Sequence, residues 1–374
     1  MDGVVSSVIH GQQTTDQRVD GGSRTMDHLE IAGRRIGAGQ PCFVIAEAGV
    51  NHNGRVELAR QLIDAAAEAG ADAVKFQTFR ADGLVTRDAP KAAYQRQATD
   101  PEESQWAMIK RLELPFEAFR QLQAHAAARG ILFLSTAFDE QSLEFLGKLR
   151  VPALKVPSGE LTNLPLLRRM GAMGLPVIVS TGMSWLGEVS AAVDTLCDAG
   201  DPPLALLHCV SQYPADASQV NLRAMDTLAH TFGRCVGYSD HTLGLEIALA
   251  AVARGACILE KHFTLDRALP GPDHRASLEP RELAELVRGV RLVGSALGDG
   301  AKQPTAAEID VAAVARKSLI ASRDIPAGGT VTRDAVAIRR PGTGLPPAMR
   351  EAVLGRRATR HIPAGTLLSL EMLA

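Results

Sequence analysis

A regular alternation of short apolar runs and helical stretches extends from residue 42 to residue 298. Eight apolar runs occur, at residues 42–49, 73–79, 131–138, 153–158, 176–183, 204–211, 234–241 and 257–264. Stretches of helical period follow them, for example residues 56–70, 139–149, 187–200 and 281–298. Eight strands that each lead into a helix are the count of a (β/α)8 TIM barrel. A doubly wound sheet is the alternative, but no GxGxxG follows the first run.

The predicted fold class is therefore α/β, with a TIM barrel over residues 29–298 and a small β-rich domain behind it. Residues 1–28 are polar and glycine-rich, which predicts a disordered tail. The alternation stops after residue 298, and residues 299–314 are predicted to be a polar linker. Residues 315–374 contain a pseudo-repeat, SRDIPAGGTVT (322–332) and TRHIPAGTLLS (359–369). A domain of sixty residues has only a marginally stable hydrophobic core. We therefore expect it to be stabilised by packing against another part of the protein or another subunit.

Charge and composition exclude several classes of protein. Lys plus Arg total 40 against 42 Asp plus Glu, a net charge of −2, which provides no field for holding nucleic acid or anionic lipid. No apolar run approaches the ~20 residues of a membrane span, and no signal pattern opens the chain. The five cysteines form no CxxC pair. We therefore expect a cytoplasmic enzyme with reduced thiols and no nucleic-acid or membrane partner.

Polar residues stand at the end of every predicted strand. They are Glu47; Lys75 and Gln77; Ser135 and Thr136; Lys155 and Ser158; Ser180 and Thr181; His208 and Ser211; Asp240 and His241; and Glu260, Lys261 and His262. The catalytic groups of TIM barrels lie at the carboxyl ends of the strands. An unpaired buried charge costs several kcal/mol, on the order of the whole stability of a domain, so this pattern predicts one shared polar cavity.

Two lysines and one carboxylate suggest the chemistry of that cavity. Lys75 and Lys155, with nearby hydroxyls and Gln77, suit a ligand that carries a phosphate and a carboxylate. Alternatively, each lysine could bury its aliphatic stem and extend its ammonium group to solvent. Both lysines lie inside apolar runs, however, where the ammonium group would not reach water. Glu47 is the one ionisable group of its run, so burial should raise its pKa and suit it to proton transfer. Permanent pairing of Glu47 with a lysine is the alternative.

Two histidines end neighbouring strands and can converge on one point. His241 and His262 would together suit a divalent cation, and satisfied core histidines are the alternative. Asp240 either orients a ring or simply ends its strand. The turn NHNG (51–54) places His52 and Asn53 at the expected rim, and PGPDH (270–274) offers Asp273. The connection from residue 79 to residue 115 is far longer than the others, which is typical of a binding loop.

The same motifs, in the same order, resemble the sialic acid synthase family. The segments are IAEAGVNHNG (45–54), KFQTF (75–79), KVPSGE (155–160), STGM (180–183), LHCVSQYP (207–214), GYSDHT (237–242), EKHFT (260–264) and GPDH (271–274). RRPGTGL (339–345) resembles the antifreeze-like (SAF) domain that follows the barrel in that family. The resemblance covers residue 29 to the end of the chain.

The resemblance implies an activity and a set of partners. Family members are phosphoenolpyruvate-dependent, C–C bond-forming transferases. They condense phosphoenolpyruvate with an N-acylated mannosamine-type sugar and water to a nine-carbon 2-keto acid and phosphate. A divalent metal, Mn or Mg, is the implied cofactor, and the implied assembly is a domain-swapped homodimer.

The resemblance also implies a role for each matching residue. The implied metal ligands are His241 and His262. The implied phosphoenolpyruvate site consists of Lys75, Gln77, Thr136, Lys155, Ser158 and Ser180. The implied catalytic residues are Glu47, Lys75, Lys155, Glu260 and Asp273, and the implied sugar-side residues are Ser211, Tyr213, Asp273 and Arg340. In this family the arginine that matches Arg340 reaches the partner subunit's sugar.

Two departures from the family pattern concern the acceptor and one loop. Ser211 stands where N-acetylneuraminate synthases commonly have Asn, and APKAAYQ (89–95) with ESQ (103–105) resembles legionaminic acid synthases, which use a 2,4-diacetamido-trideoxy mannose. Pseudaminic acid synthesis is a further possibility within the family. Ala137 replaces a common proline.

Two rival functions use the same features differently. A barrel with a buried lysine also suits an aldolase that works through a Schiff base on Lys155. Alternatively, the C-terminal domain is an ice- or carbohydrate-binding module and the barrel is catalytically inactive. Substitution of Arg340 would then not affect turnover.

Overall fold

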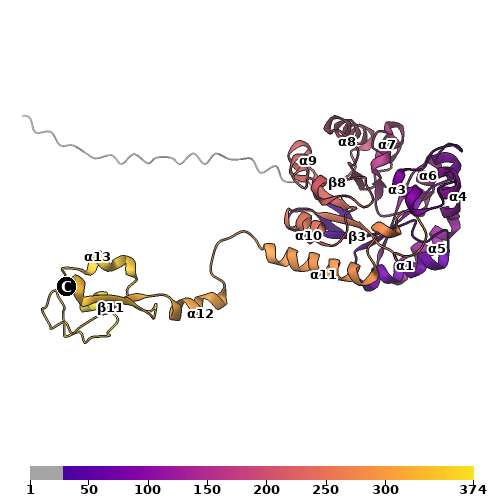
Figure 1. Cartoon of the computed structure of the whole chain (residues 1–374). Helices are drawn as coiled ribbons and strands as arrows, with labels where there is room; N and C mark the ends of the chain where they lie inside the picture. Colours follow the sequence, from indigo (N-terminus) through magenta and orange to yellow (C-terminus); the bar gives the residue numbers. More distant parts are fainter. Residues whose placement is uncertain (1–27) are drawn as a thin grey trace, which may run out of the picture. The chain divides into compact units, whose positions relative to one another are not determined.

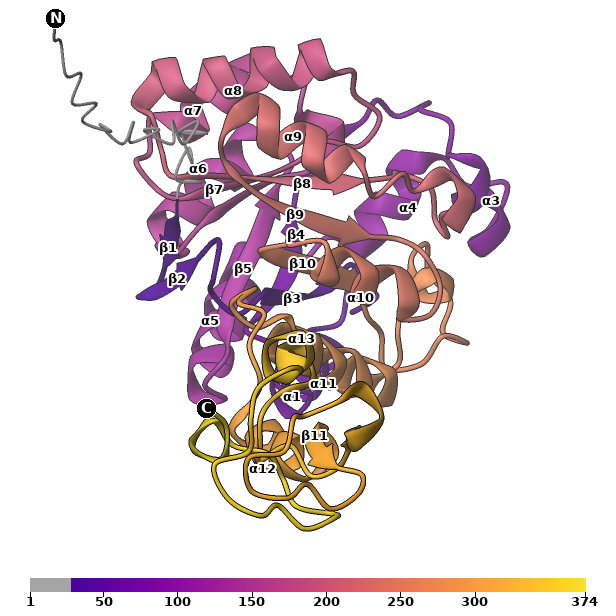
Figure 2. The same cartoon turned by 90° about the vertical axis from the view of Figure 1, so that its left-hand side faces the viewer.

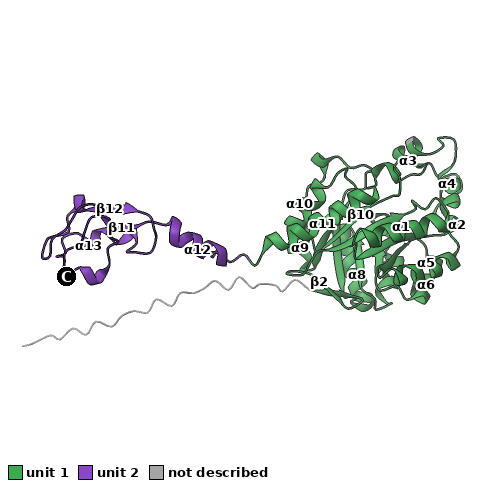
Figure 3. Cartoon of the chain, turned by 90° about the horizontal axis from the view of Figure 1, so that it is seen from below, with its two compact units in different colours: residues 1–299 green, residues 300–374 purple. Residues whose placement is uncertain are grey.

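The computed structural model describes residues 28–374, apart from the side chain of Gln97. The tail predicted for residues 1–28 lies outside the described residues, except for His28. The chain divides into two compact units, one ending at Asp299 and one spanning Gly300–Ala374 (Figure 3).

The first unit is a closed barrel of eight parallel strands, which confirms the predicted fold. Around the barrel the order is β10-β3-β4-β5-β6-β7-β8-β9, so chain order and spatial order agree. The strands are β3 (Phe43–Gly49), β4 (Ala73–Thr78), β5 (Leu132–Ala137), β6 (Leu154–Val156), β7 (Val177–Ser180), β8 (Leu204–Cys209), β9 (Cys235–Asp240) and β10 (Ile258–His262). All eight predicted strands exist, with ends a few residues shorter than predicted.

Helices surround the barrel (Figure 1). They are α1 (Val56–Glu68), α5 (Phe116–Ala128), α6 (Glu140–Leu149), α7 (Leu164–Gly171), α8 (Leu186–Gly200), α9 (Ala224–Phe232), α10 (Glu246–Ala253) and α11 (Pro280–Leu297). In α1 the residues Ala59, Leu62, Ile63 and Ala66 follow the helical period and are all buried, so one stripe packs on the strands. No helix among residues 28–374 is long and apolar enough to cross a membrane.

A short hairpin closes the amino ends of the strands. It consists of β1 (Leu29–Ile31) and β2 (Arg34–Ile36), paired antiparallel through a turn in which Ala32 and Gly33 have φ of 49° and 78°. Leu29, Ile31 and Ile36 are buried in an apolar cluster with residues from the strand starts. In Figure 2 the hairpin lies at one end of the strands and helices α3 and α4 lie at the other.

The long connection between β4 and α5 folds into three short helices, α2 (Ala81–Leu84), α3 (Ala93–Ala98) and α4 (Gln105–Leu112). We call residues 79–115 the excursion. Its side chains Phe79, Met108 and Leu112 form a small apolar cluster with Val50, which follows β3. The excursion is therefore packed against the carboxyl ends of neighbouring strands.

The second unit is small and β-rich. Its strands β11 (Ser318–Ala321) and β12 (Val336–Arg339) pair antiparallel, and α13 (Arg350–Val353) packs one buried valine, Val353, into the core. The two halves of the predicted pseudo-repeat pair with each other, because Ile325 and Ile362 exchange backbone hydrogen bonds of 2.9 Å. Short 3-10 turns across both units are Ser158–Glu160, Ala217–Gln219, His274–Ala276, Arg333–Ala335, Pro347–Met349 and Leu370–Met372.

A helix occupies much of the segment predicted as a linker. Helix α12 spans Ala306–Ala315 and buries none of its residues. Thr305 accepts a hydrogen bond from the Glu308 amide, and the Glu308 carboxylate accepts one from the Thr305 amide. This capping box and the alanine content stabilise a helix within the segment that was predicted to be a polar linker.

Candidate active site

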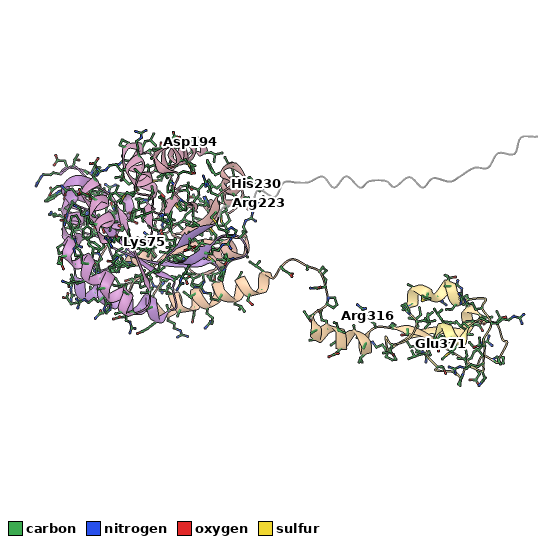
Figure 4. The ribbon with its side chains drawn as sticks, turned by 180° about the vertical axis from the view of Figure 1, so that it is seen from behind. Lys75, Asp194, Arg223, His230, Arg316 and Glu371 are labelled. Carbon is green, nitrogen blue, oxygen red and sulfur yellow. The ribbon has the colours of Figure 1, made fainter. Side chains whose placement is uncertain are left out.

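The carboxyl ends of the strands surround a cavity of about 480 Å³. Every barrel residue to which the family resemblance assigned a role lines this cavity. They are Glu47, Lys75, Gln77, Thr136, Lys155, Ser158, Ser180, Ser211, Tyr213, His241, Glu260, His262 and Asp273. Lys75 is labelled in Figure 4, where it lies within the barrel unit. Arg340 belongs to the second unit and is exposed.

Lys75 is the centre of a buried charge cluster. Its Nζ lies 2.7 Å from Glu47 Oε2 and 3.6 Å from Glu260 Oε2, and it donates to Thr136 Oγ1 at 2.9 Å. Burial alone would lower the pKa of Lys75, but the two carboxylates outweigh it and raise that pKa. Lys75 is therefore a fixed positive charge that faces the cavity.

Lys155 is less completely paired than Lys75. Its Nζ donates to Ser180 Oγ at 2.5 Å and to the Val156 carbonyl at 3.1 Å, while Glu260 Oε1 is 3.8 Å away. Burial outweighs the attraction of Glu260 and lowers the pKa of Lys155. An anionic ligand in the cavity would supply the missing counter-charge and stabilise the ammonium form.

The two carboxylates of the cluster differ in ionisation. Burial raises the pKa of Glu47 to about 7 despite the contact with Lys75, and Gln77 Nε2 donates to Glu47 Oε1 at 3.1 Å. Burial also opposes ionisation of Glu260, but Lys155 and Lys75 together lower its pKa to about 2. Glu260 thus stays charged near neutral pH, while Glu47 can give or take a proton.

The rings of His241 and His262 meet at the cavity, with centroids 5.5 Å apart. His241 Nδ1 lies 2.7 Å from the Val210 carbonyl, which can only accept, so this nitrogen carries the proton and Nε2 keeps a lone pair. His262 Nδ1 is buried and has no hydrogen-bond partner in the described structure. Burial lowers the pKa of both rings, which favours the neutral form that binds metals.

These two imidazoles fit a divalent cation only if oxygen ligands complete the coordination. Within residues 28–374 no group of three or more His, Cys, Asp or Glu side chains is arranged to hold a metal ion. The orphaned nitrogen of His262 and the lone pair of His241 provide two positions, so water or substrate oxygens would have to supply the others.

Aromatic rings and one carboxyl group line the cavity beside the histidines. The Tyr213 ring lies 4.1 Å from that of His241 and meets the His262 ring edge-on at 5.7 Å. Tyr94 of the excursion stacks on Tyr213 at 5.1 Å. Burial raises the pKa of Asp273 to about 6.

Comparison with known proteins places this arrangement in a family. The NeuB family model matches residues 62–302, and the SAF domain model matches residues 316–374. The chain is 47% identical to the N,N'-diacetyllegionaminic acid synthase of Legionella pneumophila, over 90% of this chain and 95% of the relative. It belongs to the NeuB family.

Two further relatives support this assignment. The N,N'-diacetyllegionaminic acid synthase of Campylobacter jejuni is 45% identical over 87% of this chain and 98% of the relative. The crystal structure of N-acetylneuraminic acid synthetase from Leptospira borgpetersenii in complex with citrate has 37% sequence identity and a TM-score of 0.68, covering 76% of this chain and 95% of that one.

Several strand-end residues of this NeuB-family barrel face away from the cavity. Lys261 and Asp240 are direct partners on β10 and β9 and form a buried ion pair of 2.6 Å behind the histidines. The Ser135 and Thr78 hydroxyls lie 2.7 Å apart, and His208 Nε2 contacts the Val220 carbonyl at 2.6 Å. The expectation that all strand-end polar residues share one cavity was therefore wrong for these residues.

Asp240 does not orient a histidine ring, which was one of its two predicted roles. Its Oδ1 accepts from the amide and hydroxyl of Thr242, while its Oδ2 binds Lys261. His52 and Asn53, expected at the rim, do not line the cavity, and their contacts lie within the 51–54 turn and with the 270–274 turn. His52 Nδ1 accepts from the Gly54 amide, and Asn53 Oδ1 lies 3.1 Å from His274 Nε2.

Other residues that line the cavity were not predicted from the sequence. They are Ser239, Glu160 and the excursion residues Tyr94, Gln95 and Gln105, among others. Ser239 donates to Glu260 Oε1 at 3.0 Å and holds that carboxylate toward the lysines. Two signals pointed to the excursion: its unusual length, and the resemblance of residues 89–95 and 103–105 to legionaminic acid synthases. Neither signal assigned a role to an individual residue.

Proposed function

We propose that this chain is a nonulosonate synthase that condenses phosphoenolpyruvate with an N-acylated mannosamine-type sugar and water. The products are a nine-carbon 2-keto acid and inorganic phosphate. The main support is that two buried lysines, a set of hydroxyls and a pair of neutral imidazoles line one cavity. The names of the similar synthases support the same activity.

The lysine side of the cavity suits phosphoenolpyruvate. Lys75 and Lys155 provide two ammonium groups, and Thr136, Ser158 and Ser180 provide hydroxyls at the same level of the barrel. Ser158 Oγ accepts from the Gly182 amide at 3.1 Å and lies 3.0 Å from Cys209 Sγ. Because a thiol sulfur is only a weak acceptor, a ligand oxygen would compete well for the Ser158 hydrogen. Because Glu47 is neutral over part of the physiological range, the cluster carries an excess of positive charge there.

The imidazole side suits the sugar aldehyde. A divalent cation held by His241 and His262 would supply a Lewis acid for the aldehyde oxygen. Tyr213 lies beside the His241 ring, and Asp273 lies near enough to Tyr213 to influence it electrostatically. Both line the cavity and would orient the sugar hydroxyls. Ser211 lies on the same side, where a shorter side chain than asparagine leaves more room.

The reaction then divides between the two sides. The C3 carbon of phosphoenolpyruvate forms a bond to the aldehyde carbon, the aldehyde oxygen takes up one proton to become a hydroxyl, and water adds at C2 as positive charge develops there. Glu47 in its carboxylate form takes one proton from that water. The C2–O bond to phosphate then breaks, and the C2 hydroxyl becomes the keto group as its proton leaves with the phosphate. Lys75 and Lys155 stabilise the negative charge of the departing phosphate.

We further propose that the chain acts as a domain-swapped homodimer in the cytoplasm. Arg340 is exposed on a unit that holds only a small core, and α12 exposes Ile309, Val311 and Val314. Such surfaces suit contact with a second copy. Arg340→Ala should abolish turnover and preserve the fold, and unchanged turnover would favour a separate binding module instead.

The test is a phosphate-release assay with purified protein and phosphoenolpyruvate. The acceptors are N-acetylmannosamine, 2,4-diacetamido-2,4,6-trideoxymannose and an altro-configured analogue, each with and without a chelator. Release that requires both an acceptor and a divalent cation supports the proposal. Absence of release with all three acceptors in the presence of Mn or Mg contradicts it.

One rival activity has a specific observation in its favour. The low pKa of Lys155 would suit a Schiff-base aldolase. Borohydride treatment in the presence of pyruvate would then label Lys155 covalently. Labelling would favour the aldolase, whereas phosphate release without labelling favours the synthase.

A further inference from the structure

Two hydroxyl groups on the lysine side of the cavity are each oriented by a lysine. Thr136 Oγ1 accepts from Lys75 Nζ at 2.9 Å, and Ser180 Oγ accepts from Lys155 Nζ at 2.5 Å. A hydroxyl that accepts from a fixed donor keeps its own hydrogen for another partner, such as an oxygen of a ligand. Both hydroxyls are therefore preset to donate to an anion.

The hydroxyl of Ser158 on the same side of the cavity has different neighbours. Its Oγ accepts from the Gly182 amide at 3.1 Å, and the sulfur of Cys209 lies 3.0 Å away. Cys209 is the last residue of β8, is 4% exposed and lines the cavity. No bond to this thiol forms or breaks in the proposed reaction, so its place beside Ser158 needs another explanation.

The thiol of Cys209 is neutral near physiological pH. Burial raises its pKa, although Ser158, Lys155 and the Gly182 amide oppose that rise. The thiolate is the nucleophilic form of cysteine, so a buried neutral thiol reacts poorly. Its S–H group can, however, donate weakly to an oxygen. These properties favour a role in hydrogen bonding over one in covalent catalysis.

The hydrogen bond between Ser158 and Cys209 can run in two directions. If Ser158 donates to the sulfur, its hydroxyl has no hydrogen left for a ligand. If Cys209 donates instead, the thiol and the Gly182 amide fill both acceptor positions of Ser158 Oγ, and the Ser158 hydrogen points elsewhere. A hydrogen bond to an anion is about twice as strong as a neutral one, and sulfur is a weak acceptor. A bound anion therefore favours donation from Cys209.

The chain around Gly182 keeps these groups close together. A methyl group built on Gly182 would lie 2.7 Å from Cys209 Sγ and 2.8 Å from Ser158 Oγ, so a larger residue would displace them. The amide and the hydroxyl of Thr181 both donate to the Leu207 carbonyl of β8, at 2.9 and 3.1 Å. These bonds hold the loop after β7 against the strand that carries Cys209.

We propose that Cys209 is a positioning residue of the phosphoenolpyruvate site. Its thiol donates to Ser158 Oγ and thereby directs the Ser158 hydrogen toward an oxygen of the bound anion. Cys209 orients Ser158 as Lys75 and Lys155 orient the other two hydroxyls. This inference rests on the proposed synthase function, because it takes phosphoenolpyruvate as the anion.

The first test compares two substitutions of Cys209. Phosphoenolpyruvate binding is measured by titration calorimetry without an acceptor, and KM and kcat are measured by phosphate release. Cys209→Ala removes the donor and should weaken binding about fivefold to tenfold. The KM for phosphoenolpyruvate should rise by the same factor and kcat should stay within about threefold, since the lost contact is one of binding. Cys209→Ser keeps a hydrogen-bond donor and should restore binding to within about twofold of wild type.

A double-mutant cycle with Ser158→Ala separates positioning from packing. Without the Ser158 hydroxyl the thiol has nothing to orient, so adding Cys209→Ala to Ser158→Ala should weaken binding by less than about twofold. A packing role predicts the same loss in both backgrounds. Cys197→Ala is the matched control, because it removes a thiol of α8 that does not line the cavity, and it should bind as wild type does.

The possible results distinguish the positioning role from the synthase function. Equal losses in the two backgrounds would overturn the positioning role, and so would binding by Cys209→Ser that is no tighter than binding by Cys209→Ala. Either result leaves the synthase function intact. Absence of phosphoenolpyruvate binding and of phosphate release in wild-type protein would instead refute the synthase function on which this role rests.

Discussion

The two ends of the barrel bury different kinds of side chain. At the carboxyl end Glu47, Lys75 and Lys155 are buried with too few partners to satisfy every charge. At the amino end the hairpin β1–β2 buries Ile31 and Ile36 in a wholly apolar cluster. Burying charges at the carboxyl end lowers the stability of the barrel, and burying apolar side chains at the amino end raises it. Residues at the carboxyl end should control turnover, and residues at the amino end should control stability.

Charges near the amino end are satisfied, which strengthens the contrast. Asp72 accepts from the Val44 amide at 2.7 Å, binds Arg291 at 2.6 Å and pairs with Arg34. Both arginines are partly exposed, so no charge in this group lacks a counter-charge or water. The charges of this Asp72 group are therefore already satisfied within the folded chain.

The largest expected effect is on turnover after a change at the carboxyl end. Lys155→Met should lower kcat/KM for phosphoenolpyruvate by about 10³-fold, because the proposed phosphate site would lose one of its two ammonium groups. Stability should change by less than about 2 kcal/mol, because the buried Glu260 carboxylate keeps Lys75 and Ser239 as partners and is not left unpaired. Steady-state kinetics and urea unfolding measure the two quantities.

Lys148→Met provides the control for that substitution. Lys148 forms an exposed pair with Glu144 at 2.7 Å on α6, so its loss should affect neither quantity. If Lys155→Met retained wild-type turnover, the assignment of the lysines to the phosphate would be wrong.

The next effect in size is on stability after a change at the amino end. Ile31→Ala should lower the free energy of unfolding of the barrel by about 2–5 kcal/mol, because Ile31 is completely buried. The folded fraction should keep kcat/KM within about twofold. Leu292→Ala removes an exposed side chain of α11 and should cost less than about 0.5 kcal/mol. A large loss of turnover in folded Ile31→Ala protein would contradict the separation of the two ends.

A third effect links the buried carboxyl of Asp273 to pH. Its pKa is about 6 in the folded chain and 3.8 in a model peptide, so folding favours the protonated form. The stability that this preference contributes is present below pH 4 and is lost as pH rises through 6. Asp273→Asn lacks this loss. Its unfolding free energy relative to wild type should therefore increase by about 2–3 kcal/mol between pH 4 and pH 8.

Urea unfolding at several pH values tests this expectation, with the exposed Asp198→Asn as control. Between pH 4 and pH 8, phosphate release by Asp273→Asn should be lower than that of wild-type protein. Asp273 would then be a residue that lowers stability in favour of activity. Parallel stability profiles for wild type and Asp273→Asn would show that the carboxyl is not perturbed by burial.

The sequence alone predicted the barrel and the composition of its cavity, because strand spacing and strand ends are local patterns. It did not predict which strand-end residues face inward. Strands buried on both faces are apolar throughout, so their alternation is not visible in the sequence. Lys261 and His262 therefore looked equivalent, although only His262 lines the cavity. Contacts such as Tyr94 on Tyr213 also escaped prediction, since they join segments distant in the chain.

The smallest expected effect concerns the ion pair behind the histidines. Lys261 and Asp240 precede His262 and His241 and are opposite each other on β10 and β9, so their pairing fixes the register that brings the two rings together. Asp240→Asn combined with Lys261→Met removes both charges, which avoids leaving one of them buried alone. Unfolding free energy should change by less than about 2 kcal/mol.

Binding of Mn²⁺ to the double variant, measured by titration calorimetry without substrates, should weaken 10- to 100-fold, because ligands held in the wrong orientation bind a metal poorly. The exposed pair Glu144→Gln with Lys148→Met is the control and should bind as wild type does. If the double variant of Asp240 and Lys261 bound Mn²⁺ with wild-type affinity, the ion pair would contribute to packing alone. A single Lys261→Met should be far less stable than the double variant, because it leaves the Asp240 carboxylate buried without its counter-charge.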